Sequence, residues 1–224
     1  MGPLVYKMHV IKTLPSKIAV AVSGGIDSIV TLHWLNKRRD VLAVHYIHDS
    51  EYANEEFEFV KKLCTDIGVD LLSQQQTITD RKNLSQEEYW RNGRYEFFKG
   101  IPLPVCTGHT LDDAVESYLF TAMHGQGKYM EYSHANVVRP FITTRKSELV
   151  EYASKNKLSF LEDPSNSDIN FAARNRIRHC IIPEALKINP GLHNMVKRRI
   201  IEKLNSNCNA ILNTANAIPN QNHC

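Results

Sequence analysis

Short apolar runs rich in β-branched residues alternate with segments of helical periodicity over the first 140 residues of this chain. Such alternation is typical of repeated β–α–β units around a parallel sheet. We therefore predict an α/β fold with a doubly wound, mostly parallel five-stranded sheet, which binds ligands at the carboxyl ends of its strands. The runs expected to form strands are 17–22, 41–47, 69–72, 105–107 and 137–138.

Helical periodicity fills the spaces between these runs. Between the second and third runs, apolar residues recur at helical spacing, with Asn54 as the expected cap and Gly68 as the expected stop. Beyond residue 140 the strand signals end and helical patterns remain. Apart from one helix discussed below, the predicted helices lie at 29–36, 54–67, 112–123, 146–156 and 183–203.

The charge is distributed unevenly along the chain, whose formal net charge is +3. Residues 1–138 carry 14 Lys and Arg against 17 Asp and Glu, whereas residues 139–203 carry 13 against 7. This asymmetry favours catalysis in the first part and polyanion binding in the second. We expect an α/β domain at 1–140, a basic helical appendage continuous with it at 141–204, and an Asn-rich flexible tail at 205–224.

Composition excludes several classes of protein. With 42% hydrophobic residues in 224, the chain is neither fibrous nor wholly disordered, and it is too short for a multidomain assembly. It contains no apolar run of about 18 residues and no secretory signal pattern, so we expect a soluble cytoplasmic protein without membrane contact. Its five cysteines include no Cys-x-x-Cys pair for zinc, iron–sulfur or dithiol chemistry.

A glycine-rich turn follows the first predicted strand. It reads Ser23-Gly24-Gly25-Ile26-Asp27-Ser28 and leads into the first predicted helix. The glycines let the backbone approach an anion closely, and the N–H groups of the turn and helix start can hold phosphate. No lysine follows, as it does in G-x-x-x-x-G-K-[ST], which disfavours transfer of a terminal phosphoryl group. The structural alternative is a plain strand-to-helix turn in which Asp27 caps the helix.

This turn resembles the PP-loop of the N-type ATP pyrophosphatases, and that resemblance makes 1–140 a PP-loop domain. In that family ATP is cleaved between the α- and β-phosphates, a substrate oxygen is adenylated and pyrophosphate leaves. The resemblance therefore implies ATP and Mg²⁺ at the carboxyl edge of the sheet.

The end of the fourth predicted strand narrows the resemblance. Residues Gly108 to Glu116 read Gly-His-Thr-Leu-Asp-Asp-Ala-Val-Glu and are similar to the Gly-His-x-x-Asp-Asp-x-x-Glu motif of the tRNA(Ile)-lysidine synthetases. Asp112 and Asp113 open a helix, whose dipole stabilises carboxylates, and their oxygens suit Mg²⁺ held against phosphates. The structural alternative is that one Asp caps the helix and Glu116 forms a surface pair.

The resemblance assigns roles at this edge of the sheet. His45, near the end of the second strand, matches the strand that lines the adenine pocket in that family. The expected metal ligands are Asp112 and Asp113, and the expected catalytic residues are Asp27, Asp112, Asp113 and Arg91. The expected nucleotide contacts are Ser23, Gly24, Gly25, Ile26, Asp27, Ser28, His45, Gly108 and His109.

A helix is predicted from residue 86, with Ser85 as its cap and Glu88 three residues later. Glu87, Arg91 and Arg94 fall on one face of that helix. They form either a salt-bridged surface stripe or, as the resemblance implies, a link between the ATP site and RNA.

The basic region carries the most telling similarity to the lysidine synthetases. An Asp-Pro-Ser-Asn loop at 163–166 is followed by Arg174-Asn175-Arg176-Ile177-Arg178, which offers arginine forks for phosphates and amides for base edges. The alternative is that these residues only brace the loop, and both roles can coexist. The expected RNA contacts are Glu87, Arg91, Arg94, Arg145, Asn166, Arg174, Asn175 and Arg178.

We therefore expect an ATP-dependent ligase that adenylates the wobble cytidine of an isoleucine tRNA with a CAU anticodon and then joins lysine with release of AMP. The resemblance covers residues 17–200 and implies a short form without the family's C-terminal domains; Met123-His124-Gly125 also departs from the family's Arg-Gly. The alternatives are another PP-loop tRNA-modifying enzyme, such as a 2-thiolase, and a non-catalytic nucleotide- or RNA-binding module. The oligomeric state is left open, with a homodimer as one option.

Overall fold

The fold is a doubly wound α/β sheet, as predicted. The computed structural model describes residues 8, 10–76, 83–162 and 173–216, with side chains up to residue 206. Six strands follow the order β3-β2-β1-β4-β6-β5, and neighbours are parallel except for the β5–β6 pair. The strands are β1 (Lys17–Ala21), β2 (Asp40–Ile47), β3 (Asp70–Gln75), β4 (Val105–Cys106), β5 (Ser133–His134) and β6 (Val137–Val138).

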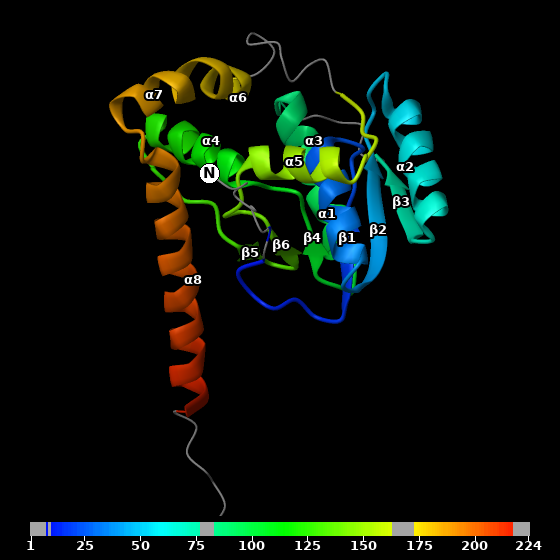
Figure 1. Ribbon diagram of the computed structural model, residues 1–224, viewed down its shortest axis with the longest axis horizontal. Coiled ribbons are helices and arrows are strands. Elements are labelled where there is room, and N and C mark those ends of the chain that lie inside the picture. Colours follow the sequence, from blue (N-terminus) through cyan, green and yellow to red (C-terminus); the bar gives the residue numbers. More distant parts are fainter. Residues whose placement is uncertain (1–7, 9, 77–82, 163–172, 217–224) are drawn as a thin grey trace, which may run out of the picture.

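Helices cover both faces of this sheet (Figure 1). Alternate residues of β1 serve the two sides: Ile18 and Val20 pack in one core cluster with residues of α1 and α2, whereas Ala19 packs with residues of α3. The period of two along a strand produces this division. The helices are α1 (Ile26–Asn36), α2 (Ala53–Ile67), α3 (Gln86–Lys99), α4 (Leu111–Met123), α5 (Lys146–Lys155), α6 (Ala173–Arg176), a π-helical turn (Ile177–Ile181), α7 (Ile182–Ile188) and α8 (Leu192–Asn216).

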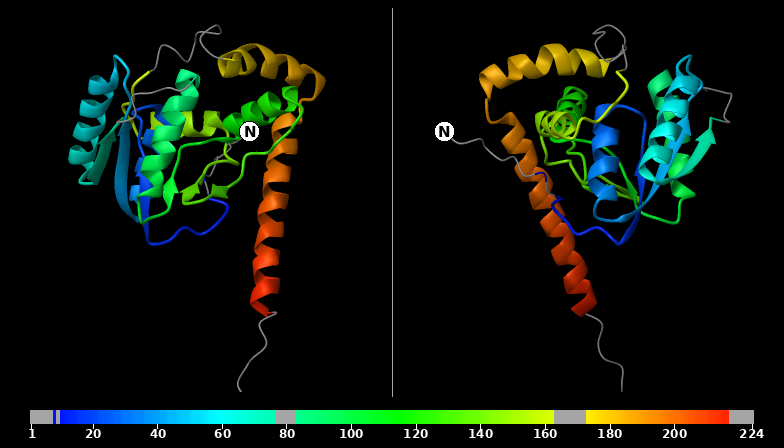
Figure 2. Two further views of the ribbon diagram at one scale, coloured as in Figure 1. Left: turned by 180° about the vertical axis from the view of Figure 1, so that it is seen from behind. Right: turned by 45° about the vertical axis from the view of Figure 1, so that its right-hand side comes forward.

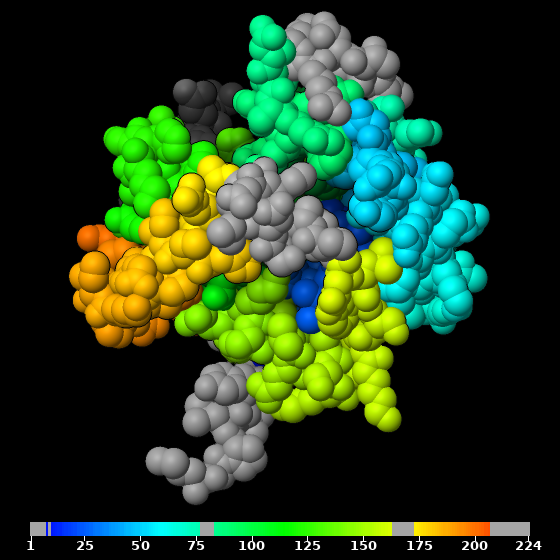
Figure 3. Space-filling view, turned by 90° about the horizontal axis from the view of Figure 1, so that it is seen from above, coloured from blue at the N-terminus to red at the C-terminus, as the bar shows by residue number. Residues whose placement is uncertain are grey.

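The carboxyl ends of the parallel strands meet at one edge, which Figure 3 views from above. There the blue atoms of the β1–α1 region reach the surface between the yellow segment after α5 and the light-blue segment after β2. This edge is where the sequence predicts the ligand site.

Helix α8 packs on α4 through Leu192, Val196 and Ile200, which lie in one core cluster with Leu111 and Val115. Its C-terminal part extends away from the α/β body in both views of Figure 2. No helix of the described residues is long and apolar enough to cross a membrane.

Several predicted boundaries were wrong. The N-cap residue of α2 is Tyr52 and not Asn54, because the backbone already has helical angles at Tyr52, in the turn before the helix. Gly68 ends α2 in the left-handed conformation at φ 67°, as predicted. One helix was expected at 183–203, but the chain turns at Asn189 and a second helix, α8, continues to Asn216, into the region expected as a flexible tail.

The sheet has one strand more than the five predicted, and this additional strand is β5. It is two residues long and exposed, and it pairs with β6 across a turn in which Ala135 has φ 50°. A run this short carries no periodicity that a sequence pattern can reveal.

The contact between α1 and α5 gives a test of this packing. Leu149 of α5 is fully buried against Val30 of α1, whereas its neighbour Val150 is 46% exposed. We expect Leu149→Ala to lower the free energy of unfolding by about 2–5 kcal/mol. Val150→Ala, measured in the same urea titration, is the control and should change it by less than about 0.5 kcal/mol. Equal effects would contradict the packing of α5 on α1.

Candidate functional site

The turn between β1 and α1 is braced by its own serines. The backbone N–H of Ser23 donates to Ser28 Oγ at 3.1 Å, and Ser28 Oγ donates to the carbonyl of Gly25 at 2.8 Å. Gly24 adopts φ 89°, which favours glycine, and Gly25 occupies the N-cap position of α1 and makes no side-chain cap. The first N–H groups of α1 are thus uncapped by Gly25, as an anion site requires.

Gly108, at the end of β4, fixes the position of this turn. A Cβ on Gly108 would lie 2.8 Å from the carbonyl carbon and oxygen of Asp27 and 3.0 Å from the nitrogen of Ser28. Thr31 of α1 also donates from its hydroxyl to the Asp27 carbonyl at 2.7 Å. The sequence predicted Gly108 and Asp27 in one site, and the backbone contact explains why glycine stands at 108.

The two oxygens of the Asp27 carboxylate have different surroundings. Its Oδ2 accepts from Lys146 Nζ at 3.0 Å, whereas its Oδ1 is buried and has no partner among the described residues. Burial raises the pKa of Asp27 above its ordinary value, although the charge of Lys146 acts in the opposite direction. Asp27 lies in the first turn of α1, whose N-cap residue is Gly25, so Asp27 does not cap this helix.

The two neighbouring aspartates at the start of α4 point to different partners. Asp113 accepts from the backbone N–H and the hydroxyl of Thr110, both at 2.8 Å, and so closes a capping box. Asp112 accepts from the backbone N–H of Lys146 at 2.7 Å and from Arg145 Nε at 3.3 Å. Its other oxygen lies 3.4 Å from His193 Nε2.

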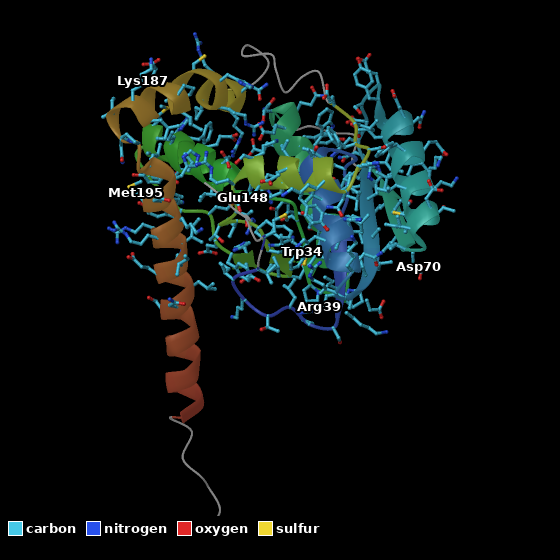
Figure 4. All side chains as sticks on the ribbon, viewed as in Figure 1. Trp34, Arg39, Asp70, Glu148, Lys187 and Met195 are labelled. Carbon is cyan, nitrogen blue, oxygen red and sulfur yellow. The ribbon has the colours of Figure 1, made fainter. Side chains whose placement is uncertain are left out.

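Asp112 is a junction between helices. Burial alone would raise its pKa, but the contacts with His193, the Lys146 N–H and Arg145 lower the pKa of Asp112 to about 2. Its Oδ2 thus holds the start of α5 against α4, whereas its Oδ1 faces His193 of α8, whose Nε2 makes no hydrogen bond among the described residues. Arg145, expected at RNA, pairs here with Asp112 and precedes α5. Its N–H donates at 2.9 Å to Glu148, which is labelled in Figure 4 on α5.

Two histidines at this edge are held neutral. His45 is buried and donates from Nδ1 to the Val22 carbonyl at 2.7 Å, directly before the glycine-rich turn. Burial lowers the pKa of His45 below its ordinary value. His109 contacts Thr107 Oγ1 at 2.8 Å through Nδ1, and burial lowers its pKa to about 4.

A chain of ion pairs links α3, α4 and the segment around α6. Glu116 is buried and bonds Arg174 Nη1 at 2.9 Å through one oxygen and Arg178 Nη2 at 2.6 Å through the other. Arg174 also pairs with Glu87 at 3.0 Å, and Arg178 lies 3.5 Å from Asp113. Glu116 is therefore the centre of a network, and not a partner in a surface pair.

The other residues expected at RNA are distributed around this network. Arg91 is exposed, with its guanidinium 5.4 Å from the Tyr95 ring, and Arg94 beside it is half-buried. Asn175 is buried next to Arg174. Asn166 and the loop around it lie outside the described residues.

Sequence reasoning missed two residues that contact the expected site residues, Lys146 and His193. Both meet their partners through long-range packing, and the only sequence signal was their place in the basic second part of the chain. Arg139, at the start of the basic stretch, is buried and donates to the Glu131 carbonyl at 2.9 Å and to Tyr95 Oη at 3.2 Å.

An aromatic cluster borders the site at the end of β2. His48 lies over Trp90 with ring centroids 5.1 Å apart, and Trp90 Nε1 donates to Asp49. His48 Nδ1 is buried without a hydrogen-bond partner among the described residues, and burial lowers the pKa of His48 to about 4. His48 is thus neutral in the folded chain at neutral pH.

The close approach at Gly108 predicts a position intolerant of any side chain. We expect Gly108→Ala to lower the free energy of unfolding by about 1–3 kcal/mol, because the methyl group displaces the backbone of Asp27. Gly100→Ala is the control, since Gly100 has an ordinary helical φ of −74° and a Cβ there meets its nearest atom at 3.5 Å. A stability of Gly108→Ala equal to that of Gly100→Ala would show that the turn lies elsewhere.

The pKa of His48 predicts a specific loss of stability in acid. Because the folded value, about 4, is below the ordinary value of 6.5, the unfolded chain binds the proton more readily between these pH values. The contribution of neutral His48 to the free energy of unfolding is complete above pH 6.5 and is lost as the pH falls toward 4. We expect His48→Gln to reduce the loss of unfolding free energy between pH 7 and pH 5 by about 2 kcal/mol.

The control for this measurement is Val150→Ala, which removes an exposed side chain that does not titrate. It should leave the pH dependence of unfolding as in the unsubstituted chain. An unchanged pH dependence in His48→Gln would contradict the burial of a neutral His48.

Comparison with known proteins extends these observations. A profile of the PP-loop domain matches residues 5–185. The chain is 32% identical to the tRNA(Ile)-lysidine synthase of Legionella pneumophila (strain Lens) over an alignment of 198 residues that covers 81% of this chain and 45% of the relative. It is 31% identical to that of Thermosipho africanus (strain TCF52B) over 200 residues, with 81% and 47% covered.

Among solved structures, the NH3-dependent NAD synthetase from Campylobacter jejuni subsp. jejuni is similar, with a TM-score of 0.47 and 16% identity over 85% of this chain and 86% of that one. The chain spans about half the length of the curated relatives it matches. The matched profile includes the glycine-rich turn, the Asp-Asp helix and most of the basic region. The chain therefore belongs to the PP-loop family, as predicted, and within it is similar to the tRNA(Ile)-lysidine synthases.

Proposed function

We propose that this chain is an ATP-dependent, RNA-modifying ligase of the tRNA(Ile)-lysidine synthase type. In the first step the wobble cytidine of an isoleucine tRNA with a CAU anticodon attacks the α-phosphate of ATP through its base oxygen, and pyrophosphate leaves. In the second step the ε-amine of lysine displaces AMP from the adenylated base and loses a proton. Family membership implies the use of ATP, and the relatives' names suggest the tRNA and lysine.

The observation that carries this proposal is the geometry of the β1–α1 turn. Gly25 leaves the start of α1 without a side-chain cap, and Gly108 packs directly behind Asp27. N–H groups held in this way stabilise negative charge that develops on the leaving pyrophosphate without reorganising. The six residues from Ser23 to Ser28 thus bind the phosphates, with the serines acting mainly as internal braces.

The donor set near Asp27 fits Mg²⁺. Asp27 Oδ1 is buried and unpaired, and the negative charge of Asp113 is close enough to raise the pKa of Asp27. Mg²⁺ is bound by one or two protein carboxylates together with substrate phosphates. We therefore propose Asp27 as the residue that would hold Mg²⁺, which would neutralise phosphate charge. The oxygens of Asp112 and Asp113, the ligands expected from the sequence, already face partners within the chain.

Asp112 takes a different role in this proposal. Its oxygens already hold the start of α5 and His193. It therefore acts as a positioning residue for α5.

The RNA is proposed to approach from α3 and the basic region. Arg91 is exposed on α3 and Arg94 lies one turn further, so both can orient the RNA and the adenylated intermediate. Arg174 and Arg178 are held by Glu116, which suits bracing as well as phosphate contact. On this proposal 1–140 carries the nucleotide chemistry and 141–204 contributes to RNA binding.

Two other functions are less well supported. A 2-thiolase with a dithiol motif is disfavoured because the five cysteines include no Cys-x-x-Cys pair. Burial also raises the pKa of Cys64 to about 11 and that of Cys106 to about 12, whereas Cys180 is exposed. A non-catalytic binding module has no need of the unpaired, buried carboxylate oxygen of Asp27 beside the phosphate turn.

The test is an assay with Mg·ATP, lysine and an isoleucine tRNA bearing a CAU anticodon, in which pyrophosphate release and the mass of the anticodon nucleoside are followed. We expect pyrophosphate release together with a lysine-sized mass gain on cytidine. The same tRNA with a GAU anticodon is the RNA control and should give neither.

A matched pair of variants accompanies this assay. Asp27→Asn should lower the rate of pyrophosphate release about 100-fold or more, whereas Asp66→Asn, on the exposed face of α2, should leave it unchanged. Pyrophosphate release without lysine incorporation would contradict the second step. RNA binding without any release would support the binding module instead.

A further inference from the structure

We propose that Lys146 supplies to the phosphates the positive charge that the glycine-rich turn lacks. This inference rests on the proposed function. The turn from Ser23 to Ser28 contains no cation, and its one ionisable residue is Asp27. Attack of the base oxygen on the α-phosphate of ATP nevertheless places new negative charge on the leaving pyrophosphate, and a nearby cation stabilises this charge.

Lys146 lies where such a cation is needed. Its Nζ is 3.0 Å from Asp27 Oδ2, and in the described part of the chain no other ion pair includes a residue of the turn. The side chain of Lys146 is 43% exposed and that of Asp27 is 25% exposed, so the pair is accessible from solvent. Because Asp27 lies in the first turn of α1, the ammonium group of Lys146 lies beside the turn that is proposed to bind the phosphates.

The neighbouring arginines are engaged elsewhere. Arg178 donates from both Nε and Nη2 to the buried Glu116, and Arg145 pairs with Asp112. Removing Arg178 from Glu116 would leave a buried carboxylate with fewer partners, which is unfavourable. The partner of Lys146, Asp27, has a side chain that is 25% exposed, whereas that of Glu116 is 4% exposed, so Lys146 can leave its partner at lower cost.

The backbone of Lys146 is anchored while its side chain is free to turn. Its N–H donates to Asp112 Oδ2 at 2.7 Å at the start of α5, and α5 packs on α1 through Leu149 and Val30. α1 is the same helix whose first turn belongs to the phosphate site. The ammonium group is thus a compact charge on a flexible four-carbon chain, mounted on a fixed base.

On this proposal the side chain of Lys146 turns from Asp27 to a phosphate oxygen when ATP binds. No covalent bond forms to Lys146, and its proton stays on the ammonium group. The alternative is that Lys146 only compensates the charge of Asp27, and the two roles can be separated by experiment.

The experiment measures the affinity of the full chain for inorganic pyrophosphate with Mg²⁺, by isothermal titration calorimetry without tRNA or lysine. We expect Lys146→Gln to weaken binding about tenfold or more and Lys146→Arg to retain most of the affinity. Lys155→Gln is the control on the same helix, because Lys155 is 65% exposed and pairs with Glu151, and it should bind as the unsubstituted chain does.

A double substitution separates contact from compensation. If Lys146 contacts phosphate, Lys146→Gln should weaken binding by a similar factor in an Asp27→Asn background. If it only compensates Asp27, the effect should disappear in that background, and the proposal would be overturned. Urea titration of each variant excludes loss of folding as the cause.

The outcomes also separate this inference from the proposed function. Affinity unchanged by Lys146→Gln overturns the inference while leaving the ligase assay unaffected. If Lys146→Gln weakens pyrophosphate binding in both backgrounds but the unsubstituted chain adds no lysine to tRNA, the phosphate role of Lys146 is supported and the proposed ligase is contradicted. An unsubstituted chain that binds no pyrophosphate overturns both.

Discussion

The backbone contact between Gly108 and Asp27 fixes the geometry on which the site depends. Because β1 and β4 are neighbours in the sheet, the turn after β1 and the turn after β4 meet at the same edge. Only a residue without a side chain lets them approach to this distance. The contact brings the uncapped start of α1 next to the capped start of α4, so that the negative charge of Asp113 comes close enough to contribute to the raised pKa of Asp27. The remaining elements of the site are arranged around these two helix ends.

Charge balance links the basic second part of the chain to the candidate site. Asp27, Asp113 and Glu116 place three carboxylates on two helices, and a buried carboxylate without a partner is strongly unfavourable. Their partners Lys146, Arg174 and Arg178 all come from beyond residue 140. The charge asymmetry along the sequence thus becomes a set of ion pairs in space. Loss of Glu116 would leave two arginines without their shared partner, so this residue supports the position of the whole region.

Much of this arrangement could be predicted because it is local. Apolar runs predict the strands, and the glycines predict the turn from Ser23 to Ser28. Gly68 predicts the C-terminal end of α2, and Ser85, which accepts from the Glu88 N–H, predicts the start of α3. The direction of Asp112 could not be predicted, because it depends on α5 and α8 packing against α4. Lys146 was missed for the same reason, since nothing in the residues around it indicates that α5 lies over α1. The break at Asn189 shows that one helical pattern can hide two helices when the turn between them is short.

The most direct test of this account is a crystal structure of the chain with Mg²⁺ and a non-hydrolysable ATP analogue. The account predicts the triphosphate over the residues from Ser23 to Ser28, at the start of α1, with the ammonium group of Lys146 on a phosphate oxygen. A nucleotide bound away from this turn would contradict the central claim that the β1–α1 turn is the phosphate site.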